Sequence, residues 1–196
     1  MFKGSNVALL TPFKNNKLDE DCYIKLINFH IENGTNGLVP AGTTGESPTL
    51  SHEEHEKVIE LCIKEAKGKI PVIAGTGANS THEAVELSQE AKLKGADYVL
   101  LVTPYYNKPN DEGLICHFSA VADLGVPVVL YNVPGRTSRE IPISVVAELA
   151  QHPHVVSVKE AAGSVERVSE ILNVCSLEVL GVGQSCYLGA FRISPF

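Results

Sequence analysis

The sequence lacks three features that mark common protein classes. No apolar run approaches the roughly 20 residues that a membrane-spanning helix needs, and the N-terminal MFKGSNVALLTPF has neither the long apolar core nor the cleavage pattern of a signal peptide. The chain has no basic cluster, and its net charge is -7, which disfavours nucleic acid and anionic membranes as partners. We therefore expect a cytoplasmic protein that binds neither nucleic acid nor membrane.

Paired cysteines are also missing. The five cysteines are scattered and never form a CxxC pair, so the sequence indicates neither a disulfide framework nor a zinc site; they are Cys22, Cys62, Cys116, Cys175 and Cys186. The first three lie in segments that we expect to be helical. With 44% hydrophobic and 20% charged residues among 196, the composition is that of a globular protein with one core.

Short apolar runs alternate with amphipathic stretches at a spacing of roughly 30 residues, which is typical of βα units. The runs predict strands at Val7–Pro12, Gly37–Gly42, Pro71–Gly75, Tyr98–Thr103, Pro127–Tyr131 and Val155–Lys159. SHEEHEKVIELCIKEAKG and STHEAVELSQEAKLKG predict helices, because each has Ser followed three residues later by Glu at its start and Gly at its end. Such alternation predicts an α/β fold with a parallel sheet, either open or closed into a barrel.

Polar residues follow strand after strand, which favours the barrel. An open sheet concentrates its site at one switch point, whereas every strand of a barrel contributes to the rim. The polar strand ends are Thr43-Thr44, Thr76, Thr103 to Tyr106, Tyr131-Asn132 and Lys159-Glu160.

Three motifs suggest familiar sites but fail on detail. AGTTGES, from Ala41, lacks the GK[ST] of a phosphate-binding loop, although its hydroxyls and backbone N–H groups would suit a carboxylate; a plain βα loop is the alternative. AGTGANS, from Ala74, lacks the third glycine of a dinucleotide fingerprint. In HEEH, from His52, the histidines are three apart rather than four, so a capped surface helix is favoured over a metal site.

VVSVKEA, from Val155, ends a predicted buried strand on Lys159. The lysine either points into solvent, as most lysines do, or shares with Ser157 the inward face of a barrel strand. In the second case, desolvation lowers its pKa and leaves an amine able to form a Schiff base with a carbonyl. In LYNVPGRT, Tyr131 is either a packed residue or a proton relay, and Arg136 is either solvated or a carboxylate ligand.

Taken in order, AGTTGES, IPVIAGTGANST, VTPYYNKP, LYNVPGRT and VVSVKEAAG resemble the dihydrodipicolinate synthase family of the N-acetylneuraminate lyase superfamily over residues 1 to about 180. The resemblance implies a TIM-type (β/α)8 barrel and a class I aldolase-type lyase. It also implies condensation of pyruvate with L-aspartate semialdehyde on the diaminopimelate route to L-lysine, without metal or organic cofactor, in a homotetramer. Sialic-acid lyases of the same superfamily lack the YNVPxRT arginine and are the alternative enzyme.

The resemblance also implies residue roles. Lys159 would form the Schiff base; Tyr131, Thr43 and Tyr106 would move protons, with Tyr106 completing a neighbouring subunit's site; and Thr44 and Arg136 would bind the carboxylates of pyruvate and of the semialdehyde. Family members that are inhibited by L-lysine bind it at a subunit interface through residues that match Ser47, His52, His55, Asn79, Glu83 and Tyr105.

The sequence departs from the family near its end. From Leu180 it has LGVGQSCYLGAFRISPF where the family continues with an SGDD-like segment. We therefore expect an incomplete barrel in residues 1–180, with about six βα units and part of a seventh strand, followed by a divergent tail, 181–196, that a frameshift would explain. A non-catalytic remnant of the enzyme is the alternative function.

Overall fold

The structure, a computed structural model, describes residues 2–181 and shows two compact units. The N-terminal unit comprises residues 2–77 and 82–100, and the C-terminal unit comprises 78–81 and 101–181. Except for Gly181, the expected divergent tail lies outside the described residues, as does Cys186.

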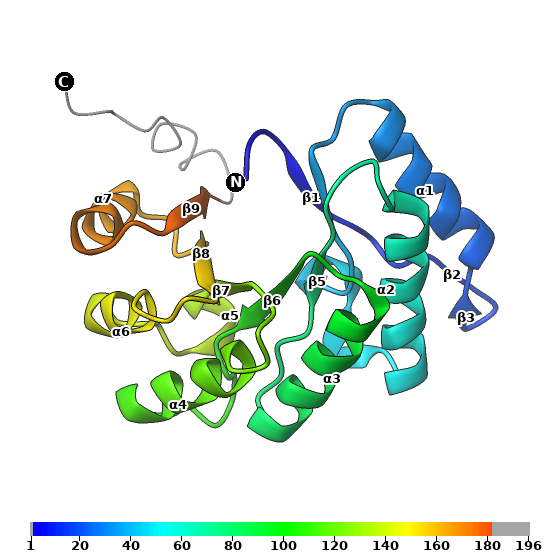
Figure 1. Cartoon of the computed structure of the whole chain (residues 1–196). Helices are drawn as coiled ribbons and strands as arrows, with labels where there is room; N and C mark the ends of the chain where they lie inside the picture. The colour runs from blue at the N-terminus through cyan, green and yellow to red at the C-terminus, as the bar shows by residue number, and fades with distance from the viewer. Residues whose placement is uncertain (1, 182–196) are drawn as a thin grey trace. The chain divides into compact units, whose positions relative to one another are not determined.

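The N-terminal unit is built on parallel strand pairs. Strand β1 pairs with β4, and β5 pairs with β6, both in parallel, while a parallel bridge joins Leu38 to Val72. Helices α1 and α2 contact each other beside these strands (Figure 1). The elements are β1 (Asn6–Ala8), α1 (Glu20–Glu32), β4 (Gly37–Val39), α2 (His52–Ala66), β5 (Ile73–Gly75), α3 (Thr81–Lys94) and β6 (Tyr98–Val102).

The helix signals predicted for α2, and the glycine that ends α3, are confirmed. Ser51 Oγ accepts a hydrogen bond from the Glu54 backbone N–H, and the Glu54 side chain accepts one from Ser51 N, which is a complete capping box at the start of α2. Gly68 and Gly95 follow the ends of α2 and α3 with φ of 73° and 96°, a backbone conformation that glycine adopts readily. HEEH is therefore the first turn of a capped helix, although His55 is buried rather than on the surface.

All four strand predictions for this unit are longer than the observed strands, and one hairpin was not expected. Strand β4 stops at Val39 because Pro40 has no N–H to donate and Ala41 has a φ of 51°. Strand β1 ends at Ala8 rather than at Pro12. Next, β2 (Phe13–Lys14) and β3 (Lys17–Leu18) form an antiparallel hairpin around a two-residue turn of asparagines.

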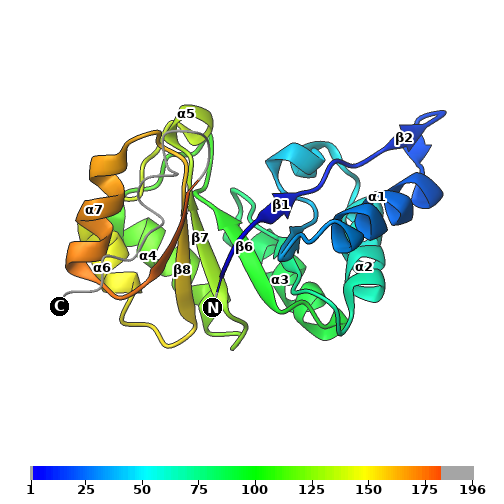
Figure 2. The same ribbon diagram turned by 90° about the horizontal axis from the view of Figure 1, so that it is seen from above.

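In the C-terminal unit, parallel strands carry helices on one side (Figures 1 and 2). The order is β7-β8-β9, and Thr103 N, just after β6, donates to Tyr131 O of β7. Helix α4 contacts α6 and β7, and α7 contacts α6 and β9. The elements are α4 (Asp111–Ala122), β7 (Val128–Asn132), α5 (Pro134–Thr137), α6 (Ile143–Leu149), β8 (Val155–Glu160), α7 (Val165–Val174) and β9 (Glu178–Gly181). All six predicted strands are thus present, and β9 is the partial seventh.

The pairing of β7 with β8 contains a bulge. Val128 pairs with Val155, but the next residue, Val129, pairs with Ser157, so Val156 is an extra residue in β8. The register then continues regularly and places Tyr131 opposite Lys159 and Asn132 opposite Glu160. All five residues of β7 are buried, as is typical of a strand inside a parallel sheet.

Candidate active site

Lys159 lies over the ring of Tyr131 at the carboxyl ends of β8 and β7. Its Nζ atom is 4.4 Å from the ring centroid. The lysine is half-buried, and Tyr131 is only 6% exposed. Because side chains alternate along a strand, Ser157 and Lys159 share one face of β8, while Val158 and Glu160 share the other. The solvent-pointing alternative for Lys159 therefore does not describe this structure.

The surroundings of Lys159 favour its neutral form. Burial lowers the pKa of the lysine below its ordinary 10.5, because removing an ammonium group from water costs more than removing an amine. The tyrosine ring attracts the protonated form and so acts in the opposite direction. A lysine with a lowered pKa beside a phenol has the two components of amine-carbonyl chemistry, a nucleophile and a proton carrier.

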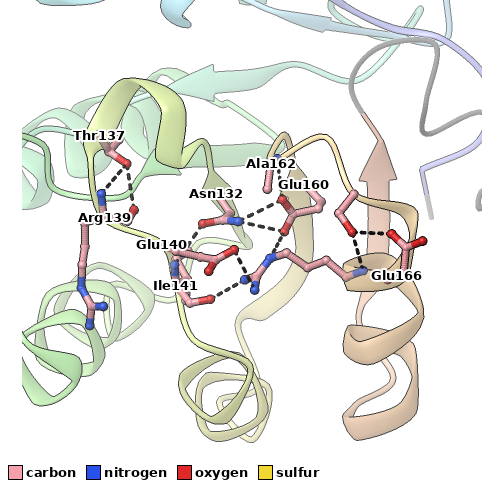
Figure 3. A network of polar contacts seen from close by, with 10 residues as sticks. Asn132, Thr137, Arg139, Glu140, Ile141, Glu160, Ala162 and Glu166 are labelled. Atoms are coloured by element: carbon pink, nitrogen blue, oxygen red, sulfur yellow. Dashed lines mark hydrogen bonds and ion pairs between the residues drawn. The ribbon is translucent and has the colours of Figure 1, made fainter.

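On the opposite face of the same two strands lies a buried polar cluster that was not predicted from the sequence (Figure 3). Glu160 is fully buried. Its Oε1 accepts from Asn132 Nδ2 at 2.9 Å and from Ala162 N at 2.7 Å. Its Oε2 accepts from Asn132 Nδ2 at 3.0 Å and from Arg167 Nε at 2.8 Å. Every oxygen of this carboxylate is thereby paired, as burial of a charge requires.

Arg167, from α7, links this carboxylate to the segment before α6. Its guanidinium donates to the Ile141 carbonyl and forms an ion pair with Glu140 at 3.0 Å. Ile141 N in turn donates to Asn132 Oδ1 at 3.0 Å, which closes a ring of contacts between β7, β8 and α7. The sequence signals for it were Asn132 and Glu160 among the polar strand ends and an arginine in the first turns of the next helix.

Arg136 and Tyr106 belong to the same unit but lie in exposed positions. Arg136 is in the short helix α5, directly after β7. Thr137 anchors this helix, since its hydroxyl donates to the Arg139 carbonyl at 2.8 Å. Tyr106 is 91% exposed and has a φ of 72°, an uncommon conformation for a non-glycine residue.

Thr43 and Thr44 lie in the N-terminal unit, in a single 3-10 turn that spans Thr43–Gly45. The Gly45 carbonyl accepts a hydrogen bond from Thr11 Oγ1 at 2.7 Å, which fixes the turn beside the end of β1. The two threonines are half-buried and exposed, respectively. The turn has no phosphate-binding Lys, as the sequence indicated.

The residues expected to bind L-lysine fall in both units, and the structure brings one pair of them together. His52 Nε2 and Glu83 Oε1, both in the N-terminal unit, are 3.4 Å apart. His55 is buried, and burial lowers its pKa. In the C-terminal unit, the Asn79 carbonyl accepts from Asn107 Nδ2 at 3.0 Å. The remaining two residues of this set are Ser47 and Tyr105.

The described residues contain neither a metal-binding cluster nor a membrane-spanning helix. Between Phe2 and Gly181, no group of three or more His, Cys, Asp and Glu side chains is arranged to hold a metal ion. Within the same residues, no helix has both the length and the apolar character to cross a membrane.

Comparison with known proteins gives consistent matches. Residues 1–181 match the model of the dihydrodipicolinate synthetase family. The chain is 60% identical over 171 residues to the 4-hydroxy-tetrahydrodipicolinate synthase of Pelagibacter ubique, covering 87% of this chain and 58% of that protein. It is 56% identical to that of Thermodesulfovibrio yellowstonii, with coverage of 89% and 60%. The chain therefore spans about three fifths of the length of these relatives.

Solved structures match equally well. The 4-hydroxy-tetrahydrodipicolinate synthase of Methylacidiphilum fumariolicum SolV superposes with a TM-score of 0.94 at 41% identity, covering 97% of this chain and 65% of that one. The dihydrodipicolinate synthase of Acinetobacter baumannii, complexed with pyruvate, gives 0.90 at 47% identity, with coverage of 92% and 64%. The enzyme of Cyanidioschyzon merolae, with lysine bound, gives 0.86 at 33% identity, with coverage of 95% and 72%.

Proposed function

The chain belongs to the dihydrodipicolinate synthetase family, and on this premise we propose that it acts as a 4-hydroxy-tetrahydrodipicolinate synthase. Its α/β fold with parallel strands is the fold of that barrel family, of which it covers about two thirds. The proposed reaction is the condensation of pyruvate with L-aspartate semialdehyde in L-lysine biosynthesis. The observation that carries the proposal is Lys159 Nζ, 4.4 Å above the Tyr131 ring and with a pKa lowered by burial.

The proposed steps begin with the neutral amine of Lys159. Its nitrogen attacks the ketone carbon of pyruvate, and the resulting carbinolamine loses water to form the Schiff base. Loss of a proton from the pyruvate methyl group gives an enamine, whose terminal carbon attacks the aldehyde of the second substrate. The protonated Schiff base accepts the electrons of the broken C–H bond, so the steps need no metal or organic cofactor.

Tyr131 is proposed to carry protons at the Schiff base, because its ring contacts the lysine directly. Thr43 and Tyr106 are assigned to the same relay, and Thr44 to the pyruvate carboxylate, by the family resemblance. The 91% exposure of Tyr106 supports a role at the surface of a homo-oligomer, where it would reach a neighbouring subunit. Light scattering of the purified chain tests this oligomer, and a monomer would contradict it.

Borohydride trapping tests the Schiff base. Intact mass spectrometry of the 196-residue chain after incubation with pyruvate and borohydride should show one adduct, mapped to Lys159. Lys159→Ala should lose the adduct, and Lys94→Ala is the matched control because it removes a lysine that lies elsewhere in an ion pair with Glu56. No adduct, with the Pelagibacter ubique enzyme labelled in parallel, would favour the non-catalytic remnant.

Arg136 is proposed to bind the carboxylate of the semialdehyde, since a guanidinium pairs with a carboxylate through two parallel hydrogen bonds. Its exposed position on α5 leaves it accessible to a substrate. Arg136→Gln should keep pyruvate trapping but abolish condensation, measured by consumption of the semialdehyde. Cleavage of N-acetylneuraminate by the unmodified chain would instead support the sialic-acid lyase alternative.

We further propose L-lysine as a feedback inhibitor, bound by Ser47, His52, His55, Asn79, Glu83 and Tyr105. The proximity of His52 and Glu83 supports this, because Glu83 offers a carboxylate to the ligand's ammonium group. Glu83→Ala should lose inhibition, whereas Glu86→Ala, which removes an exposed carboxylate paired with His82 on the same helix, should keep it. Equal inhibition of both variants would refute the assignment.

A further inference from the structure

Each of the two strands that carry the Lys159–Tyr131 pair has a buried polar residue directly after its reactive one. Asn132 follows Tyr131, and Glu160 follows Lys159, so by alternation the pair Asn132–Glu160 lies on the opposite face. The register sets Tyr131 opposite Lys159 and Asn132 opposite Glu160. The Tyr131–Lys159 contact and the Asn132–Glu160 contact are therefore formed by consecutive residue pairs of β7 and β8.

The hydrogen bonds of the Asn132–Glu160 pair can be made in only one arrangement of the two side chains. Glu160 accepts from the amide of Asn132, from Ala162 N and from Arg167 Nε, so all the atoms that face it are donors. Asn132 cannot turn its amide over, because its Oδ1 accepts from Ile141 N at 3.0 Å. Arg167, which is 7% exposed, fixes the far side through the Ile141 carbonyl and Glu140.

We propose that Glu160, Asn132 and Arg167 form a positioning cluster, part of the polar network in Figure 3, that holds the ends of β7 and β8 so that Lys159 stays over the Tyr131 ring. The three residues are positioning residues and are not assigned to substrate binding. Asn132 and Glu160 act through the backbone that joins them to Tyr131 and Lys159, the residues directly before them. The cluster couples the reactive pair to α7 and to the segment before α6, which gives the strand ends a support that backbone hydrogen bonds alone do not supply. The role in catalysis rests on the proposed Schiff-base function.

Two variants that keep the net charge test the cluster. Asn132→Leu removes the amide that bridges to Glu160 and to Ile141 N, and Arg167→Lys replaces a three-way donor by a single ammonium. Arg139→Lys is the matched control, because Arg139 bonds to the Pro109 carbonyl and to Asp111 and not to Glu160. Circular dichroism identifies the temperature at which each chain is folded.

The first readout is pyruvate trapping. At saturating pyruvate, the two cluster variants should react with Lys159 at least about tenfold more slowly than the unmodified chain, since a ~1 Å misplacement can cost ~100-fold in rate. Arg139→Lys should react at the unmodified rate. A purely structural role would lower the folded fraction and leave the rate per folded molecule unchanged, and that result would overturn the proposal.

The second readout does not need pyruvate, so it separates this inference from the proposed function. Acetic anhydride labelling of Lys159 over a pH series, followed by peptide mass spectrometry, reports where the amine loses its proton. The midpoint should rise toward the ordinary lysine value in both cluster variants, because a displaced lysine is better solvated, and stay low in Arg139→Lys. If the unmodified chain forms no pyruvate adduct, the proposed function fails and this midpoint alone decides. An unchanged midpoint in folded variants, or failure of both variants to fold, would overturn the positioning role.

Discussion

Replacing His117 by Asn is expected to flatten the pH dependence of folding stability between pH 7.5 and 5. His117 lies in α4, is 3% exposed, and is bonded through Nδ1 to Thr81 Oγ1 at 2.9 Å. Its Nε2 has no hydrogen-bond partner within residues 2–181. Burial lowers the pKa of the imidazole from 6.5 to about 4, because a charged ring there would lose its hydration.

The size of the effect follows from this pKa. Above pH 6.5 the histidine is neutral in the folded and the unfolded chain and has no effect. As the pH falls from 6.5 toward 4, the unfolded chain takes up a proton that the folded chain does not, so stability falls. At ~1.36 kcal/mol per pH unit, the loss is about 2 kcal/mol at pH 5 and about 3 kcal/mol below pH 4.

Urea unfolding followed by circular dichroism measures this loss at a series of pH values. His117→Asn keeps an acceptor for Thr81 and removes the titrating group, so its stability should fall between pH 7.5 and 5 by about 2 kcal/mol less than that of the unmodified chain. The variant is less stable at every pH because the ring is lost, and only the slope is diagnostic. Equal slopes in the two chains would refute the reasoning.

Three further predictions concern the last residue of β5, the N-terminal cap of α2 and Lys159. Gly75→Ala should destabilise the chain by about 1–3 kcal/mol, since an added Cβ would lie 2.2 Å from the Ala41 carbonyl oxygen; an unchanged urea midpoint would contradict this. Ser51→Ala should cost about 1 kcal/mol through loss of the α2 cap, measured in the same way, and should not alter pyruvate trapping. The rate of pyruvate trapping by Lys159 should rise with pH to a plateau whose midpoint lies below 10.5, because only the neutral amine attacks; a midpoint at or above that value would contradict the desolvation argument.

The βα alternation was predictable because each strand is a short apolar run and each main helix has local signals at its ends. Ser51 with Glu54 and Gly68 marked α2 within two residues, since capping involves near neighbours in the sequence. Strand ends were less predictable: Pro40 and Ala41 end β4 early through backbone geometry. The β2–β3 hairpin was not predicted, because strands of two residues are too short to show a pattern. The Asn15-Asn16 pair, with φ of 53° and 58°, has the positive φ values that a two-residue hairpin turn requires.

The site was predictable only on one face of its strands. Lys159 and Tyr131 were identified by their place in motifs, and alternation gave the inward face as one of the two orientations considered for Lys159. The cluster of Asn132, Glu160 and Arg167 was missed because its contacts join residues 7 and 28 positions apart, and sequence patterning carries no information on such pairings. The contacts that the proposed roles of Thr43 and Thr44 require are likewise tertiary contacts, which the order of residues in the sequence does not specify.

The extra residue Val156 in β8 has a consequence for which changes in length this strand tolerates. Without it, Val155 and Ser157 would be adjacent and would lie opposite Val128 and Val129, so the pairing would become regular and Lys159 would still lie opposite Tyr131. Loss of a second residue between Val155 and Lys159 would shift the strand end by one step and set Glu160 opposite Tyr131, turning the amine toward the helices and the carboxylate toward the phenol. Among relatives, loss of one residue in this stretch is therefore expected to be tolerated and loss of two to be absent, because β8 has one residue more here than its register with β7 requires.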